Sequence, residues 1–263
     1  MEIDWDQVKK KTLWHYEKLI AKILDVLEFN FVQEYYAHDM TEAGIYSEKI
    51  RQGYLQNDRE ADFVGEITKH FKDLSLLGIR NYQDLVGRVN TKSHCEKFLQ
   101  ETGFSFEALI LVLDFLFRWV LPFKIPIKEL VDTMPHTNTT YLEIFKNRGV
   151  RSNLDVLETF RSKMGRKMFS AETGIDETYI LELAHRADIS RLAYVRGKTI
   201  MHLCGGGYNT LNKLENAEIM KMEADMTAYY ESIGKSFADF KTVIPLDWMI
   251  GGANILPKII EDE

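Results

Sequence analysis

A segment of this chain recurs, without a gap, 71 residues further along the sequence. The segment GIRNYQDLVGRV begins at Gly78, and its counterpart GVRSNLDVLETF begins at Gly149. The correspondence continues further along the chain, where FLQETG, which ends at Gly103, matches FSAETG, which ends at Gly174. An internal repeat indicates that one supersecondary unit is used more than once. We therefore predict that 78–121 and 149–192 fold into similar helical units.

The units open with the same turn signal. Apolar residues one helical turn apart precede Gly78, Gly149 and Gly207 in the forms F-x-x-L-x-x-x-G, L-x-x-F-x-x-x-G and I-x-x-L-x-x-x-G, and a weaker form surrounds Gly234. Glycine adopts the left-handed conformation that ends many helices, and Ser, Asn or Thr shortly afterwards caps the next helix. The pattern predicts short helices joined by tight glycine turns, which is an all-α fold.

The residues that precede the first such unit are predicted to form a separate helical region. Apolar side chains recur at alternating steps of three and four from Leu13 to Leu27. This is the stripe of one long helix, from about residue 5 to residue 36. The same spacing is found in coiled coils. The stripe therefore packs against the rest of the chain or mediates self-association.

The most apolar stretch is Phe104–Phe123. A membrane-spanning helix needs ~20 apolar residues with few or no charges. Here Glu107, Asp114 and Arg118 interrupt the run, and Pro122 ends it. The stretch predicts a helix buried in a core or in a dimer face, and no membrane partner. Together with the N-terminal stripe, it leads us to expect at least a weak homodimer of the common isologous type.

Charge and cysteine content narrow the class of protein further. The net charge is −7, from 33 basic and 40 acidic residues, which opposes non-specific binding to nucleic acid. Basic residues nevertheless gather between Lys146 and Lys167 and between Arg186 and Lys198. Such a group forms a solvated helix face or a phosphate site. Cys95 and Cys204 cannot form a disulfide framework, so we expect a reducing, cytoplasmic environment.

The segment Gly174–Ala217 carries a recognisable pattern. It contains Ala187-Asp188-Ile189, then Arg191, a hairpin, a helix, the turn at Gly207 and the pair Thr210-Leu211. This order resembles a bacterial and archaeal domain of unknown function with helix-hairpin-helix character. The resemblance is direct over 174–217 and weaker over 71–240. It implies tandem helix-hairpin-helix-like repeats, and it implies no activity.

The hairpin itself departs from the type that binds nucleic acid. Such a hairpin typically reads Gly-apolar-Gly, because its backbone N–H groups must approach a phosphate closely. Here Tyr194-Val195-Arg196 occupies that place, followed by Gly197-Lys198-Thr199. Side-chain charge replaces the close backbone contact, or the hairpin is a structural corner. The candidate nucleic-acid site comprises Lys163, Arg166, Lys167, Arg191, Arg196, Gly197, Lys198 and Thr199.

Partial matches to motifs of known chemistry are incomplete in this sequence. Gly197-Lys198-Thr199 lacks the earlier glycine and the preceding strand of a P-loop. The pairs His94-Cys95 and His202-x-Cys204 supply too few ligands in the spacing of a structural zinc site. We therefore assign no catalytic residue, no metal and no cofactor, and we expect the protein not to be an enzyme.

The sequence thus predicts an N-terminal helical region over 1–70, a first helix-hairpin-helix-like repeat over 71–147, and a second repeat unit with degenerate copies over 148–263. The expected function is that of a non-enzymatic helical-repeat binding or scaffold protein, which binds a protein partner or itself. The alternative is nucleic-acid binding through phosphate contacts.

Overall fold

The computed structural model describes residues 3–36, 38–53, 58–132, 134, 139–241 and 245–261. In these ranges the secondary structure is helical, apart from the isolated bridges Asp39–Asn81 and Pro126–Ser152, which confirms the all-α prediction. The chain divides into two compact units, 1–121 and 122–263. The division into three segments that the repeats suggest stays a prediction.

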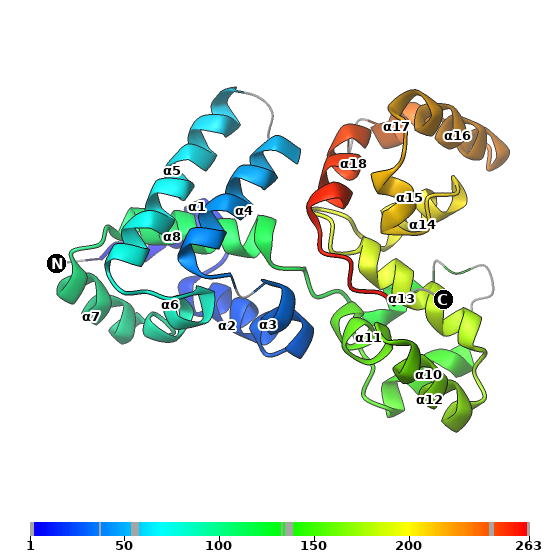
Figure 1. Ribbon diagram of the computed structural model, residues 1–263, viewed down its shortest axis with the longest axis horizontal. Coiled ribbons are helices and arrows are strands. Elements are labelled where there is room, and N and C mark those ends of the chain that lie inside the picture. Colours follow the sequence, from blue (N-terminus) through cyan, green and yellow to red (C-terminus); the bar gives the residue numbers. More distant parts are fainter. Residues whose placement is uncertain are drawn as a thin grey trace. The chain divides into compact units, whose positions relative to one another are not determined.

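Within its described residues, the first unit contains eight α-helices, the last of which continues into a π-helical turn (Figure 1). They are α1 (Asp6–Thr12), α2 (Tyr16–Leu27), α3 (Asn30–Tyr36), α4 (Met40–Gly53), α5 (Asp58–Leu76), α6 (Tyr82–Arg88), α7 (Lys92–Thr102) and α8 (Phe106–Phe115), with η1 (Leu116–Val120).

The single long N-terminal helix is not formed. Leu13 adopts a left-handed φ of 68° and ends α1. The Thr12 hydroxyl donates to the Val8 carbonyl and accepts from the Trp14 N–H, so it replaces bonds that a continuing helix would make. Beyond this break the stripe from Tyr16 to Leu27 is buried inside the unit, whereas Leu13 is 72% exposed. The stripe therefore packs within its own chain.

The stretch Phe104–Phe123 supplies the core helix of the first unit. Ser105 caps α8, whose apolar side chains are buried against α1 and α5. Two charged residues of this stretch, Asp114 and Arg118, form an ion pair at 2.7 Å. Burial raises the pKa of Asp114, although Arg118 opposes that shift. Of the two predicted roles, core helix and dimer face, the structure shows the first. None of the helices that the structure describes is both long and apolar enough to span a bilayer.

The second unit is also helical, and an extended C-terminal segment follows its last helix (Figure 1). Its helices are α9 (Ile127–Val131), α10 (Thr139–Asn147), α11 (Asn153–Phe160), α12 (Lys163–Thr173), α13 (Glu177–Ile189), α14 (Gly197–Gly205), α15 (Leu211–Glu215), α16 (Ile219–Ser232), α17 (Phe237–Lys241) and α18 (Leu246–Ile255).

The predicted glycine turns end α5, α10, α14 and α16 in one common geometry. Gly78, Gly149, Gly207 and Gly234 all have positive φ, between 68° and 94°. Each glycine N–H donates to the carbonyl three residues back, and the next N–H donates to the carbonyl five residues before it; the bond from Ile79 to Leu74 measures 3.1 Å. These are Schellman motifs, which satisfy the last carbonyls of a helix.

Helix bounds in the two units follow the displacement seen in the sequence. The helices α6, α7 and α8 begin at 82, 92 and 106, whereas α11, α12 and α13 begin at 153, 163 and 177. The Met40 N–H donates to the Arg80 carbonyl, and the Ile127 N–H donates to the Arg151 carbonyl. Each start in the second set lies 71 residues after its counterpart. The tandem repeat stays a prediction, which these shared bounds and bonds support.

Candidate interaction surfaces

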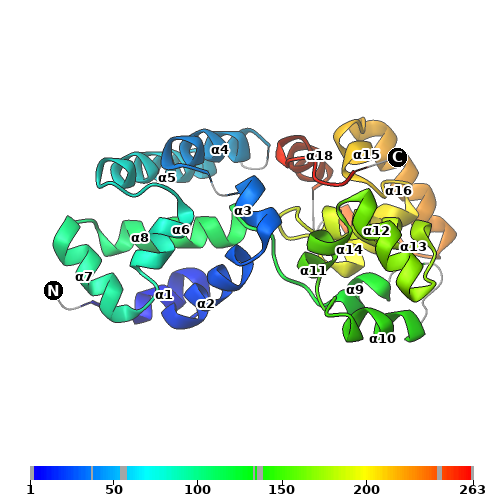
Figure 2. The same ribbon diagram turned by 60° about the horizontal axis from the view of Figure 1, so that its bottom comes forward.

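An apolar groove of about 690 Å³ lies along α4 and α5 in the first unit. The two helices lie side by side in both views (Figures 1 and 2). Two large side chains at the groove are exposed, Ile45 to 57% and Leu76 to 79%. The groove is lined by Met40, Thr41, Gly44, Ile45, Glu48, Gly65, Thr68, Lys69, Lys72, Ser75 and Leu76.

Small residues create the depth of this groove. A Cβ atom added at Gly44 would lie 3.7 Å from Cγ2 of Thr68, so α4 approaches α5 closely there. The hydroxyl groups of Ser47 and Thr68 are hydrogen-bonded at 2.8 Å and fix the two helices together. A Cβ atom at Gly65 would meet nothing within 4 Å, so this glycine leaves open space. The groove therefore lies over a fixed helix pair.

Charged side chains border the apolar floor. Lys69 and Lys72 lie on α5 and form no ion pair within the described ranges. On α4, Glu48 is already paired with Arg51 at 2.8 Å. The positive charge beside the groove is therefore available to an incoming partner. A partner that places carboxylates beside apolar side chains fits this arrangement.

The predicted phosphate site contains two arginines that are buried. Arg166 is 1% exposed and donates to the carbonyls of Phe160 at 3.0 Å and Glu261 at 2.6 Å. Arg191 is 5% exposed; it donates to the Asp188 carboxylate at 2.8 Å and to the Pro257 carbonyl at 2.8 Å. Both guanidinium groups therefore hold the C-terminal segment in place. In this structure neither faces solvent, where a phosphate would bind.

The hairpin before α14 is a packed corner. Tyr194 has a left-handed φ of 62° at the first position where a nucleic-acid-binding hairpin carries glycine. The Arg196 guanidinium lies 4.3 Å from the centre of the Phe123 ring, and burial lowers its pKa. A Cβ atom at Gly197 would lie 2.7 Å from the Glu129 carbonyl oxygen. Gly197 is thus required for packing against α9.

The remaining residues of the predicted site lie on two helices. Lys163 is half-buried, and its N–H donates to Oε2 of Glu261 at 2.8 Å. Thr199 is half-buried as well, whereas Lys167 on α12 and Lys198 on α14 are exposed. The structure thus leaves two freely exposed cations from the predicted set.

The histidines and cysteines have individual surroundings. Burial raises the pKa of Cys95 to about 11, and a bond from Tyr16 opposes this shift. Nδ1 of His94 lies 2.7 Å from Oδ1 of Asn90. The ring of His202 is buried among Tyr229, Tyr230 and Phe240. In the ranges that the structure describes, no three His, Cys, Asp or Glu side chains are grouped to hold a metal ion.

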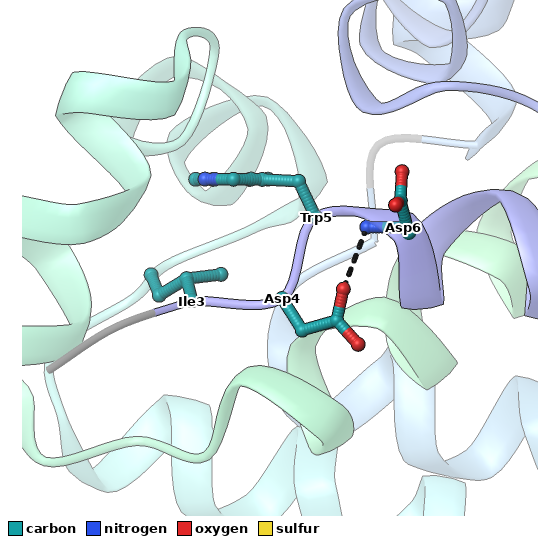
Figure 3. A pocket seen from close by; sticks show the side chains of 4 residues that line it. All are labelled: Ile3, Asp4, Trp5 and Asp6. Carbon is teal, nitrogen blue, oxygen red and sulfur yellow. Dashed lines mark hydrogen bonds between the residues drawn. The ribbon is translucent and has the colours of Figure 1, made fainter.

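A second hollow, of about 520 Å³, lies at the start of the first unit (Figure 3). Its lining is Ile3, Asp4, Trp5 and Asp6. Oδ1 of Asp4 accepts the Asp6 N–H at 3.1 Å, so this carboxylate caps the turn into α1. The Trp5 ring packs against Tyr16 and Phe106. The residues of this hollow therefore serve to attach the N-terminal segment to the unit.

Comparison with known proteins finds a family match for part of the second unit. The family model described as "Domain of unknown function (DUF4332)" matches residues 135–235, which is less than half of the chain. This supports the resemblance to a domain family of unknown function. No curated protein and no solved structure matches the chain. The groove between α4 and α5 lies outside the matched residues.

Proposed function

We propose that the protein is a non-enzymatic binding or scaffold protein, and that the groove of α4 and α5 receives an apolar segment of a protein partner. The observation that carries this proposal is the groove of about 690 Å³ with exposed Ile45 and Leu76 beside it. Burying one such side chain in an interface is worth roughly 1.5–3 kcal/mol. Association itself costs about 4–15 kcal/mol, so these two side chains supply part of the free energy of binding, and the apolar floor of the groove and its lysines must supply the rest.

The partner segment is best matched by an amphipathic helix with an acidic edge. A groove between two helices that lie side by side accepts apolar side chains at helical spacing, as other helix-in-groove interfaces do. Lys69 and Lys72 then face carboxylates of the partner. The rigid attachment of α4 to α5 through Ser47 and Thr68 lowers the ordering cost of binding.

A pair of matched peptides tests this proposal. Both are short amphipathic helices with the same leucines, one with Glu and the other with Lys along its edges. We expect the acidic peptide to bind more tightly than the basic one, and we expect the substitution Ile45→Asp to weaken the binding of the acidic peptide roughly tenfold or more. The control is Ile219→Asp, because Ile219 is 48% exposed on α16 in the other unit. Equal binding of both peptides, or an unaffected Ile45→Asp variant, contradicts the proposal.

We infer further that α4–α8 and α9–α13 are two copies of one helix-hairpin-helix-like module. The support comes from the shared helix starts, the Schellman turns at Gly78 and Gly149, and the paired bridges of Asn81 and Ser152. A solved structure in which the two segments superpose over most of their Cα atoms is the expected result. Segments that do not superpose would refute the inference.

A further inference from the structure

At the bend between α1 and α2, Leu13 is an exposed leucine in a backbone conformation that favours glycine. Its φ is 68°, and its side chain is 72% exposed. The Leu13 N–H donates to the Lys9 carbonyl at 3.0 Å and so ends α1, as a glycine in this conformation would. Neither burial nor the turn therefore requires leucine here, and glycine would be less strained. Strained residues of this kind are typical of functional contacts.

The next residue, Trp14, extends this apolar tip and gathers positive charge. Nζ of Lys18 lies 4.7 Å from the centre of the Trp14 ring, and Nζ of Lys22 lies 4.6 Å from it. The Trp14 N–H donates to the Thr12 hydroxyl at 3.2 Å, and this hydroxyl donates to the Val8 carbonyl at 2.8 Å. Hydrogen bonds therefore fix the bend, and two ammonium groups beside one ring give it a positive potential.

Four lysines around the tip form no ion pair within the described ranges. They are Lys9 and Lys10 on α1 and Lys18 and Lys22 on α2. The neighbouring carboxylate of Glu17 is paired with Lys92 at 2.9 Å. Asp6 lies in the first turn of α1 and Asp25 lies in the last turn of α2, so both are at the ends of these helices that are remote from the bend. The bend therefore carries an excess of positive charge on a chain with a net charge of −7.

We propose that this tip, formed by Leu13, Trp14 and the four lysines, docks the protein on the surface of a bilayer that contains anionic lipids. Leu13 enters the boundary between headgroups and acyl chains, and Trp14 lies at the level of the headgroups, where tryptophan is enriched. The ammonium groups of the lysines contact the anionic headgroups, while their apolar stems cover the ring and the tip.

The composition of the tip favours a bilayer over an acidic protein or a nucleic acid. A protruding leucine gains nothing from carboxylates or phosphates, but it gains free energy when it leaves water for acyl chains. Single-stranded nucleic acids stack their bases on aromatic faces. At Trp14 the ammonium groups of Lys18 and Lys22 already lie over the ring. The pairing of exposed apolar side chains with free lysines is instead typical of surfaces that lie on a membrane.

The tip is separate from the groove of the proposed function. In Figure 2, α1 and α2 lie at the opposite margin of the first unit from α4 and α5. A bound bilayer therefore leaves the groove open to a protein partner, and the inference does not depend on that partner. The expectation of no membrane partner came from the stretch Phe104–Phe123 as a candidate span. Binding at the surface depends on the bend at Leu13, which the sequence pattern placed inside one long helix.

Co-sedimentation with lipid vesicles tests the requirement for charge. We expect the protein to bind phosphatidylcholine vesicles that contain phosphatidylserine, to bind vesicles of phosphatidylcholine alone far more weakly, and to be released as the salt concentration rises. Lys18→Glu/Lys22→Glu should weaken binding roughly tenfold or more. The control Lys69→Glu/Lys72→Glu changes the net charge equally at exposed positions of α5, and should stay within about twofold of the wild type. A wild type that does not bind the phosphatidylserine vesicles, or an equal loss in both variants, overturns the proposal.

The substitution Leu13→Gly separates a bilayer from other anionic partners. Glycine suits a φ of 68°, so the variant should be at least as stable as the wild type. It should nevertheless bind the phosphatidylserine vesicles roughly fivefold more weakly, because the inserted side chain is missing. The control is Leu76→Ser, because Leu76 is 79% exposed on α5. If Leu13→Gly binds the vesicles as tightly as the wild type, the bilayer proposal is wrong. Titration with polyglutamate and single-stranded DNA then distinguishes an acidic protein from a nucleic acid as the partner.

Discussion

The Arg166 guanidinium donates a hydrogen bond of 2.6 Å to the backbone carbonyl of Glu261, which lies 95 residues further along the chain. Two more carbonyls, those of Phe160 and Arg161, accept from the same side chain. A basic residue in a charged stretch thus serves as the buried anchor of the C-terminal segment.

Replacement of this arginine should destabilise the protein. In Arg166→Met the carbonyls of Phe160 and Glu261 lose this donor inside the unit, whereas the Arg161 carbonyl keeps its bond from the Glu261 N–H. A buried unsatisfied polar group costs about 1–3 kcal/mol. We expect a loss of about 2–4 kcal/mol in the free energy of unfolding by urea, and faster amide exchange over 257–261. Lys167→Met, at an exposed position of the same helix, should change stability by less than about 0.5 kcal/mol. An equal effect of the two variants would show that the anchor is unimportant.

Two glycines separate the effect of backbone conformation from that of packing. A Cβ atom would meet nothing within 4 Å at either Gly78 or Gly87, but only Gly78 has a positive φ, of 77°. Gly78→Ala should therefore destabilise the protein by roughly 1 kcal/mol or more, whereas Gly87→Ala should stabilise it by about 0.4–1 kcal/mol. Thermal or urea unfolding of both variants shows whether each substitution raises or lowers the free energy of unfolding. Changes of the same sign would contradict the assignment of strain to the turn.

The glycine turns were predictable because their signal is local. An apolar pair followed by glycine fixes the end of one helix, and a side-chain cap such as Ser152 fixes the start of the next. The same reasoning failed at Leu13. That break contains neither glycine nor proline, and it depends on the Thr12 hydroxyl, which a stripe of apolar residues does not reveal.

The candidate site was less accessible to sequence reasoning, because it depends on distant contacts. Arg191 belongs to a basic cluster in the sequence, but its partner carbonyl at Pro257 is 66 residues away. The groove was not predicted because it forms between two helices, and the residue pattern of neither α4 nor α5 alone indicates it. The one available signal was the small residues Gly44 and Gly65, which leave a helix face without side chains.

Stability should depend on pH through three histidines. Burial lowers the pKa of His38, His70 and His202, each from an ordinary value of 6.5, and Lys235 and Lys198 lower that of His202 further. Below pH 6.5 the unfolded chain therefore binds more protons than the folded chain. The free energy of unfolding is highest above that pH, and it decreases as the pH falls through the folded pKa values.

Urea unfolding at a series of pH values measures this dependence. The wild type should lose stability between about pH 7 and pH 5. His202→Phe keeps an aromatic ring beside Tyr230 and Phe240 and should give a shallower dependence in that range. A variant with the same slope as the wild type would exclude His202 as a contributor.

Binding to nucleic acid should be weak or absent. Arg166 and Arg191 are buried and donate to carbonyls, and Arg196 is stacked on Phe123. Lys167 and Lys198 remain exposed on a chain with a net charge of −7. Two phosphate contacts would give a salt slope of about −1.8, at −0.9 for each neutralised phosphate, and too little affinity to oppose the overall repulsion.

Fluorescence anisotropy with duplex and single-stranded DNA at low salt gives the measurement. We expect no saturable binding, and no change on Lys167→Glu/Lys198→Glu. The double variant should keep the helical content of the wild type, because both side chains are exposed. Salt-dependent binding that this variant abolishes equally for all sequences would instead establish a phosphate site at α12 and α14, because phosphate contacts carry no sequence information. The basic cluster would then have a function beyond anchoring the C-terminal segment.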